Sequence, residues 1–142
     1  MTKTRNTLQR DIVLQTILSM RGHATADKIY ERIHALHPSI SRATVYRNLK
    51  MLEGEGKVMR IEVSDGADYF EARTQEHYHI RCARCGKLFD AALPFMPDLV
   101  TMEQAADSEF EIYSCNLLFV GFCPECKAKQ SAQEHIEQAS DK

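Results

Sequence analysis

Ser41-Arg42-Ala43-Thr44-Val45-Tyr46-Arg47-Asn48-Leu49-Lys50-Met51-Leu52-Glu53 has the pattern of an amphipathic helix. Val45, Leu49 and Leu52 recur at helical spacing, Ser41 is a favoured N-cap, and glycines follow the stretch. The other face carries residue types that bond phosphates and base edges when a helix enters a major groove. These candidate DNA-binding residues are Arg42, Thr44, Tyr46, Arg47 and Lys50.

Two more helices are predicted before this stretch. Apolar residues at helical spacing mark a first helix that closes at Arg21-Gly22. They are Leu8, Ile12, Val13, Ile17, Leu18 and Met20. Thr25 can cap a second helix that ends at Pro38. Its predicted buried residues are Ile29, Ile33 and Leu36.

A hairpin is predicted after the third helix. Residues 57–63 are rich in strand-forming types, residues 64–67 suit a turn, and residues 68–71 form a return strand. Three short helices followed by a hairpin predict a winged helix-turn-helix over residues 1–72. A small helical bundle with an incidental hairpin is the alternative. The basic, tyrosine-bearing outer face of the third helix favours a DNA-binding domain.

Charge divides the chain in the same way. Residues 1–60 hold eleven Lys or Arg and five Asp or Glu, whereas residues 61–142 hold seven and fifteen. The first part therefore suits a polyanionic partner and the second does not. No run approaches the ~18 apolar residues of a membrane helix, and the N-terminus is polar without a signal core. We expect a cytoplasmic protein that does not bind a membrane.

Four of the five cysteines form two Cys-x2-Cys pairs, Cys82-Ala-Arg-Cys85 and Cys123-Pro-Glu-Cys126. Two such pairs complete the tetrahedral four-sulfur shell of a structural Zn2+ site. Two disulfides are the alternative, but a reducing compartment favours metal. The predicted elements around these pairs are small, so a structural metal and dimerisation are both physically motivated.

The second half is predicted as a small zinc-bearing α/β domain over residues 73–142, which makes the whole chain α+β. Strands are expected at 78–82 and 87–91, a helix at 94–107, and one or two strands at 110–122. The polar tail from Lys127 is expected to fray after a short helix. His77 and His79 share one face of the first strand because side chains alternate, so joint metal ligation is expected.

The order of these pieces resembles the ferric uptake regulator (Fur) family of metal-dependent repressors, over nearly the whole chain. Each matching stretch is short, but five in this order are highly specific. The stretches are Thr7-Leu8-Gln9-Arg10, His23-Ala24-Thr25-Ala26-Asp27, Ser41 to Leu49, His77 to Gly86 and Cys123-Pro124-Glu125-Cys126. The resemblance implies a homodimer with a C-terminal dimerisation domain and Zn2+ in the four-cysteine site. It also implies a regulatory metal that closes the dimer onto a pseudo-palindromic, AT-rich double-stranded DNA operator.

The resemblance also implies the ligands of that regulatory metal. They are His23, Glu71, His77, His79 and Asp90. Three imidazoles and two carboxylates make a mixed nitrogen–oxygen set that suits Fe2+, Mn2+ or Zn2+; Fe2+ or Mn2+ is the expected corepressor. Each residue also has a simpler interpretation, as a surface histidine or a solvated carboxylate.

The carboxylates help to distinguish members of the family. At the position of Glu71, peroxide sensors resemble one another in having Asp, iron-uptake repressors have Glu, and zinc-uptake repressors tend to have Cys. At the position of Asp90, peroxide sensors have Asp and iron-uptake repressors have Glu. Iron-uptake repressors often have an acidic residue where this chain has Tyr78. Asp90 and Tyr78 favour a peroxide-responsive (PerR-like) repressor, and an iron-uptake repressor is the main alternative.

Two other classes of function fit less of the sequence. A zinc deaminase would need His-x-Glu and a proline before the second cysteine pair, and this chain has His-x-His with the proline inside the pair. A rubredoxin-like iron site would leave the basic helical half without a role. We therefore expect no enzyme. Cys115 is expected to be an inert core thiol or an altered ligand, and His34, His37 and His135 are expected to be bystanders.

Overall fold

The computed structural model describes residues 2–64, 66–96, 109–111 and 115–140, and the side chains up to residue 134. The chain divides into two compact units, Met1–Gln75 (unit 1) and Glu76–Lys142 (unit 2). The sequence predicts the boundary after residue 72. Within the described residues, no helix is long and apolar enough to cross a membrane.

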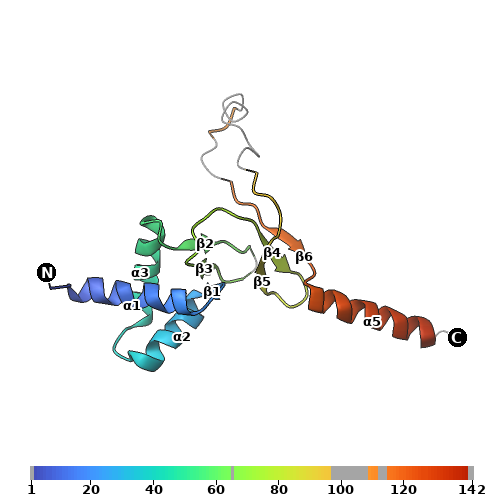
Figure 1. Ribbon diagram of the computed structural model, residues 1–142, viewed down its shortest axis with the longest axis horizontal. Helices are drawn as coiled ribbons and strands as arrows, with labels where there is room; N and C mark the ends of the chain where they lie inside the picture. The colour runs from blue at the N-terminus through green and yellow to red at the C-terminus, as the bar shows by residue number, and fades with distance from the viewer. Residues whose placement is uncertain (1, 65, 97–108, 112–114, 141–142) are drawn as a thin grey trace. The chain divides into compact units, whose positions relative to one another are not determined.

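Three helices, each begun by a side-chain cap, build unit 1: α1 (Arg5–Ser19), α2 (Ala26–Leu36) and α3 (Arg42–Gly54) (Figure 1). The hydroxyls of Thr4, Thr25 and Ser41 accept hydrogen bonds from backbone N–H groups three residues later. Thr25 and Ser41 are the caps that the sequence predicts. The helices pack on one another around a core drawn from all three.

A three-stranded antiparallel sheet completes unit 1, in the order β1-β3-β2. Its strands are β1 (Ala24–Thr25), β2 (Met59–Ile61) and β3 (Tyr69–Glu71). The predicted hairpin is the β2–β3 pair, with shorter strands than expected, and β1 was not predicted. Together the helices and sheet confirm the winged helix-turn-helix.

The unit 1 core confirms most of the predicted buried faces and corrects three residues. Ile29, Ile33, Val45, Leu49 and Leu52 are all 1% exposed or less. The structure leaves three predicted core residues on the surface, with 78% of Leu36, 52% of Leu18 and 49% of Leu8 exposed. Leu36 is the last residue of α2, where the core no longer continues.

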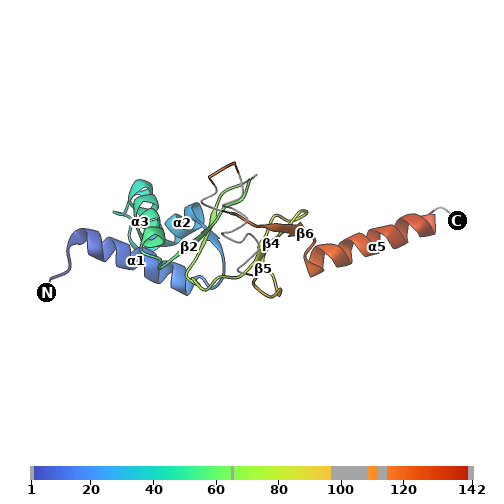
Figure 2. The same cartoon turned by 90° about the horizontal axis from the view of Figure 1, so that it is seen from above.

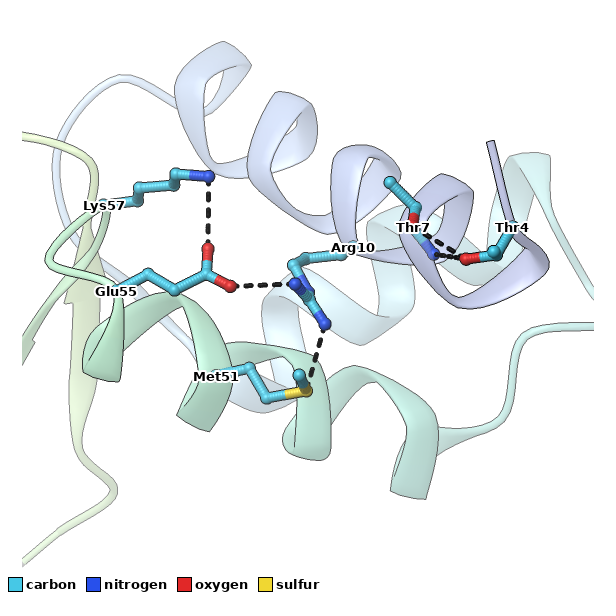
Figure 3. A network of polar contacts seen from close by, with 6 residues as sticks. All are labelled: Thr4, Thr7, Arg10, Met51, Glu55 and Lys57. Atoms are coloured by element: carbon cyan, nitrogen blue, oxygen red, sulfur yellow. Dashed lines mark hydrogen bonds and ion pairs between the residues drawn. The ribbon is translucent and has the colours of Figure 1, made fainter. Parts of the chain in front are cut away.

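A polar network ties α1 to the end of α3 (Figure 3). Arg10 Nη1 donates to Glu55 Oε1 at 2.8 Å, and Arg10 Nη2 donates to Met51 Sδ at 3.4 Å. Lys57 Nζ lies 3.1 Å from the other oxygen of Glu55. The Glu55 carboxylate, with a cation on each side, therefore links α1 to the segment that follows α3.

Unit 2 contains a second three-stranded sheet, in the order β5-β4-β6. Its strands are β4 (His79–Cys82), β5 (Leu88–Asp90) and β6 (Phe119–Gly121). β5 pairs antiparallel with β4, and β6 pairs parallel with it. The parallel pairing brings Gly121 opposite Cys82, so the cysteine that ends β4 lies beside the segment that leads to the second cysteine pair.

Helix α5 (Pro124–Ser140) follows β6 and continues for 17 residues, as one unbroken helix (Figure 2). The short, fraying helix expected after Lys127 was therefore wrong. The predicted helix at 94–107 falls largely outside the described residues, and residues 94–96 are not helical. Of the predicted strands at 110–122, the structure describes one, β6.

Candidate metal centres

The four paired cysteines meet in unit 2. The sulfurs of Cys82, Cys85, Cys123 and Cys126 all lie within 4.8 Å of one another. None of the four cysteines is in a disulfide. The sulfurs of Cys85 and Cys123 are 3.9 Å apart, far beyond the ~2.05 Å of a disulfide. Tetrahedral Zn2+ with Zn–S bonds of ~2.3 Å requires sulfur–sulfur distances of about 3.8 Å. The arrangement fits structural zinc.

The backbone around each pair explains this convergence. Cys82 ends β4, and the turn to Cys85 closes with the backbone N–H of Gly86 donating to the carbonyl of Cys82 at 2.9 Å. Gly86 has φ 73°, a left-handed conformation that favours glycine. In the second pair, Cys123 precedes α5 and accepts a hydrogen bond on Sγ from the N–H of Cys126 at 3.5 Å. Cys123 is therefore the N-cap of α5.

The thiols differ in how readily they ionise. Hydrogen bonding from the backbone N–H of Cys123 is the main cause that lowers the pKa of the Cys82 thiol to about 6. Burial is the main cause that raises the pKa of the Cys126 thiol to about 12. Thiolates are the form that binds Zn2+. Cys82 is thus ready for metal at neutral pH, whereas the proton of Cys126 must be displaced.

Zinc affinity should fall with decreasing pH, because Zn2+ binds thiolates and has to displace every proton that the thiols carry, that of Cys126 among them. A zinc titration against a competing chelator at pH 7 and pH 5 tests this, and equal affinities at the two pH values would contradict it.

The predicted regulatory residues of unit 1 form a buried pair. His23 Nε2 lies 2.9 Å from Glu71 Oε2, and the two side chains are 9% and 5% exposed. The sheet explains the contact, because β1 pairs with β3 with Ala24 opposite Phe70. One residue further along this antiparallel register, His23 lies opposite Glu71. The turn that delivers His23 contains Gly22 at φ 103°, which requires glycine.

The predicted regulatory residues of unit 2 form a second cluster. His77 Nε2 and His79 Nε2 lie 3.0 Å and 3.5 Å from the same oxygen, Oδ1 of Asp90. His79 pairs with Asp90 across β4 and β5, and the two imidazole rings are 4.4 Å apart with an interplanar angle of 55°. Both histidines are largely buried and Asp90 is half-exposed. The joint placement of His77 and His79 is as the alternation of side chains predicts.

Both clusters combine imidazole nitrogens with a carboxylate and contain no sulfur donor. Unit 1 supplies an imidazole nitrogen and a carboxylate, and unit 2 supplies two imidazole nitrogens and a carboxylate. Mixed nitrogen and oxygen donors without sulfur suit Fe2+ and Mn2+, and also accept Zn2+. The four cysteines therefore offer sulfur donors, whereas these two clusters offer only nitrogen and oxygen donors.

The candidate DNA-binding residues lie along α3. Arg42, Tyr46, Arg47 and Lys50 are exposed, and the last three line a groove of about 1130 Å³ between α3 and the β2–β3 hairpin. Thr44 differs from them, because its hydroxyl lies 2.9 Å from Ser41 Oγ in the helix cap. The half-buried Thr44 therefore belongs to the cap at the start of α3, and its contact with DNA stays a prediction.

Two polar residues near this face were not predicted from the sequence. Asp27, in the first turn of α2, bonds to both Arg42 and Tyr46. Asn48 is buried and donates to the carbonyl of Thr44 at 2.9 Å. The contacts of Asp27 link residues 15 and 19 positions apart, which no local pattern reveals. Asn48 carried a signal, since a polar residue beside Leu49 on a predicted buried face needs a partner.

The remaining candidates have simpler surroundings. Cys115 is exposed within the single chain, so the expectation of a buried core thiol was wrong. His34 Nδ1 lies 3.4 Å from the hydroxyl of Tyr30, and His37 is the exposed C-cap of α2. The side chain of His135 lies outside the described residues.

Comparison with known proteins is consistent across sequence and structure. A model of the ferric uptake regulator family matches residues 1–120. A peroxide-responsive repressor PerR of Staphylococcus epidermidis is 33% identical over 123 residues, which span 87% of this chain and 81% of that protein.

Solved structures of two kinds of regulator share the fold. The Campylobacter jejuni peroxide stress regulator is 30% identical, with a TM-score of 0.62, over 86% of this chain and 91% of that one. The Helicobacter pylori ferric uptake regulator is 26% identical, with a TM-score of 0.65, over 87% and 82%. The second structure is described as having three functional metal-binding sites.

Proposed function

The chain belongs to the ferric uptake regulator family, and we propose that it is a metal-dependent, DNA-binding transcriptional repressor of the peroxide-responsive kind. Its corepressor is Fe2+ or Mn2+, and Zn2+ in the four-cysteine site is structural. The observation that carries the proposal is the pair of imidazole nitrogens, from His77 and His79, that face one oxygen of Asp90 at 3.0 Å and 3.5 Å. Two imidazole nitrogens and a carboxylate so close to one another support the proposal of a metal at this position.

The regulatory metal takes its ligands from both units in this proposal. His23 and Glu71 come from unit 1, and His77, His79 and Asp90 come from unit 2. Neither set alone supplies enough donors for a metal that prefers five or six ligands. A metal that binds both sets favours one relative orientation of the two units, and this differential affinity is what a metal-driven switch requires.

The DNA-binding role rests on α3. Arg42, Tyr46, Arg47 and Lys50 are exposed on the helix that follows the turn of a winged helix-turn-helix, where side chains reach phosphates and base edges. The protein acts in the cytoplasm as a homodimer. Because a two-fold dimer presents two such helices to two half-sites, its operator is pseudo-palindromic. We expect that operator to be AT-rich. Residues 73–142 form the dimerisation domain.

Peroxide sensing is favoured over iron-uptake control by Asp90 and by relatives. The curated relatives at about one-third identity are peroxide-responsive repressors, and the short Asp90 side chain is half-exposed. His23, His77 and the other proposed ligands would hold Fe2+, which would supply the one-electron reduction of hydrogen peroxide that precedes oxidation of a ligand imidazole. Glu71 is the residue that favours an iron-uptake repressor instead, since that class resembles this chain there.

The test combines DNA binding with mass spectrometry. The zinc-containing dimer should bind a palindromic AT-rich duplex when Fe2+ or Mn2+ is added. Peroxide should abolish DNA binding of the Fe2+ form and leave that of the Mn2+ form unchanged. In the Fe2+ form, one added oxygen should appear on a peptide that contains His23 or His77. The measurement is best made on Cys115→Ser, which removes the exposed thiol as a second oxidation site, with the peptide of His37 as the internal control.

Each result separates the alternatives. Metal-dependent DNA binding that survives peroxide, with unmodified peptides, identifies an iron-uptake repressor. Binding that needs no added metal in the zinc-containing dimer contradicts the switch. Oxidation of His37 to the same extent as His77 would show general damage instead of a reaction at the metal.

A further inference from the structure

One carboxylate on α2 holds two of the proposed DNA-contacting side chains of α3. Oδ1 of Asp27 accepts hydrogen bonds from both Arg42 Nη1 and the hydroxyl of Tyr46. We propose that Asp27 is a positioning residue that sets the sequence specificity of DNA recognition by orienting Arg42 and Tyr46. The inference rests on the proposed function, since it concerns how the same helix face recognises DNA.

The contact with Tyr46 determines which part of that side chain faces outward. The hydroxyl donates to Asp27 at 2.8 Å, while 45% of the residue remains exposed in the groove beside α3. The same hydrogen bond is the main cause that raises the pKa of Tyr46, so the phenol stays protonated. With its proton committed to Asp27, Tyr46 offers the ring face and edge, which suit an apolar group such as a thymine methyl.

The contact with Arg42 prepares a phosphate-binding cation. Its guanidinium pairs with Asp27 and lies over the ring of Tyr30, 4.5 Å from the ring centroid. Both neighbours come from α2, so a long side chain at the start of α3 is held before DNA arrives. A guanidinium has five N–H donors, and one bond to Asp27 leaves donors for a phosphate. Ordering this side chain in advance lowers the entropy cost of binding.

Charge alone predicts the opposite effect of Asp27. A carboxylate on a surface that meets phosphates repels them, and Arg60 at the far side of the groove is already offset by Glu53 at 3.4 Å and Glu62 at 2.6 Å. Removing an acidic side chain near this face should therefore strengthen DNA binding if the charge is all that matters. A positioning role predicts weaker, less selective binding after the same removal. The two roles therefore predict opposite changes in DNA affinity when Asp27 is removed.

The first-turn location of Asp27 offers a purely structural role as well, because acidic side chains stabilise helix N-termini. Loss of that role would lower the thermal stability and reduce binding to every duplex equally. Only a positioning role changes the ratio of affinities for two sequences. The specificity ratio is therefore the quantity to measure.

The experiment uses the full-length, metal-loaded dimer and a duplex that the wild-type protein selects from a random-sequence pool, with a shuffled duplex of the same length. Asp27→Ala should lower the ratio of the two affinities about tenfold. Glu31→Ala is the matched control: it removes the same charge from an exposed position of the same helix, with no polar contact to α3 among the described residues. Its ratio should stay at the wild-type value.

Tyr46→Phe completes the design. If Asp27 acts through the Tyr46 hydroxyl, Asp27→Ala should change the ratio less in the Tyr46→Phe background than in wild type. The proposal is overturned if Asp27→Ala tightens both duplexes as Glu31→Ala does, or weakens both by one factor. Selection of no preferred duplex by the wild-type protein would overturn the proposed function and this inference together; a selective wild type with an unchanged ratio overturns the inference alone.

Discussion

Replacement of Cys85 by serine should remove zinc from the protein and unfold unit 2. Cys82, Cys123 and Cys126 form a buried cluster among the described residues of that unit, so the metal and its ligands make up part of the core. Structural zinc contributes about 10–16 kcal/mol in zinc-finger peptides, as much as the whole stability of an ordinary domain, about 5–15 kcal/mol. A domain this small cannot compensate for the loss.

Metal analysis, gel filtration and circular dichroism together test this expectation. The variant should hold less than one zinc per chain, elute as a monomer or aggregate, and lose helix signal. Cys115→Ser is the matched control, since the same substitution at an exposed cysteine outside the cluster should change none of the three. A Cys85→Ser protein that remains a folded, zinc-containing dimer would show that three thiolates suffice and that the fold of the unit does not depend on the complete site.

Replacement of His77 by alanine should abolish the effect of Fe2+ or Mn2+ on DNA binding and leave the protein folded. His77 precedes β4, and its imidazole contacts Asp90 and the ring of His79. Among the described residues it belongs neither to the apolar core of unit 1 nor to the cysteine cluster, so its loss should not disturb either. Allosteric couplings of about 1–3 kcal/mol correspond to changes in affinity of about 5–150-fold. In His77→Ala, the ratio of the DNA affinities with and without the metal should fall to nearly one.

Fluorescence anisotropy of a labelled duplex, with and without added metal, measures this gain. His37→Ala serves as the control, because His37 is an exposed histidine at the end of α2, away from Asp90 in the sequence and in a different unit. It should keep the full gain. Zinc content and thermal unfolding of His77→Ala should match wild type. A retained gain in this variant would remove His77 from the regulatory site.

The helices of unit 1 could be predicted because their signals are local. Ser41 and Thr25 cap their helices through bonds that span three residues, and Val45 and Leu49 face inward at helical spacing. Strand β1 was missed because two residues carry no alternating pattern, and it exists through its pairing with β3. Leu36 kept the helical spacing but lies where α2 ends, so periodicity alone could not show that it is exposed.

The candidate site divides in the same way between local and distant information. The spacing of Cys82 and Cys85 predicts a metal-binding turn, and the alternation of His77 and His79 predicts a shared face, because both are short-range geometry. The pairing of His23 with Glu71 depends on the register of β1 and β3, and only the resemblance to a family suggested it. The bonds of Asp27 to α3 had no sequence signal at all.

The location of Cys123 at the N-cap of α5 has an electrostatic consequence. Four thiolates around Zn2+ form a complex with a net charge of about −2. The first turn of a helix carries a partial positive charge from its unpaired N–H groups, and α5 begins directly after one of these thiolates. The helix and the metal complex therefore neutralise part of each other's charge: zinc anchors the start of α5, and the aligned peptide dipoles of its 17 residues help to keep an anionic cluster inside the protein.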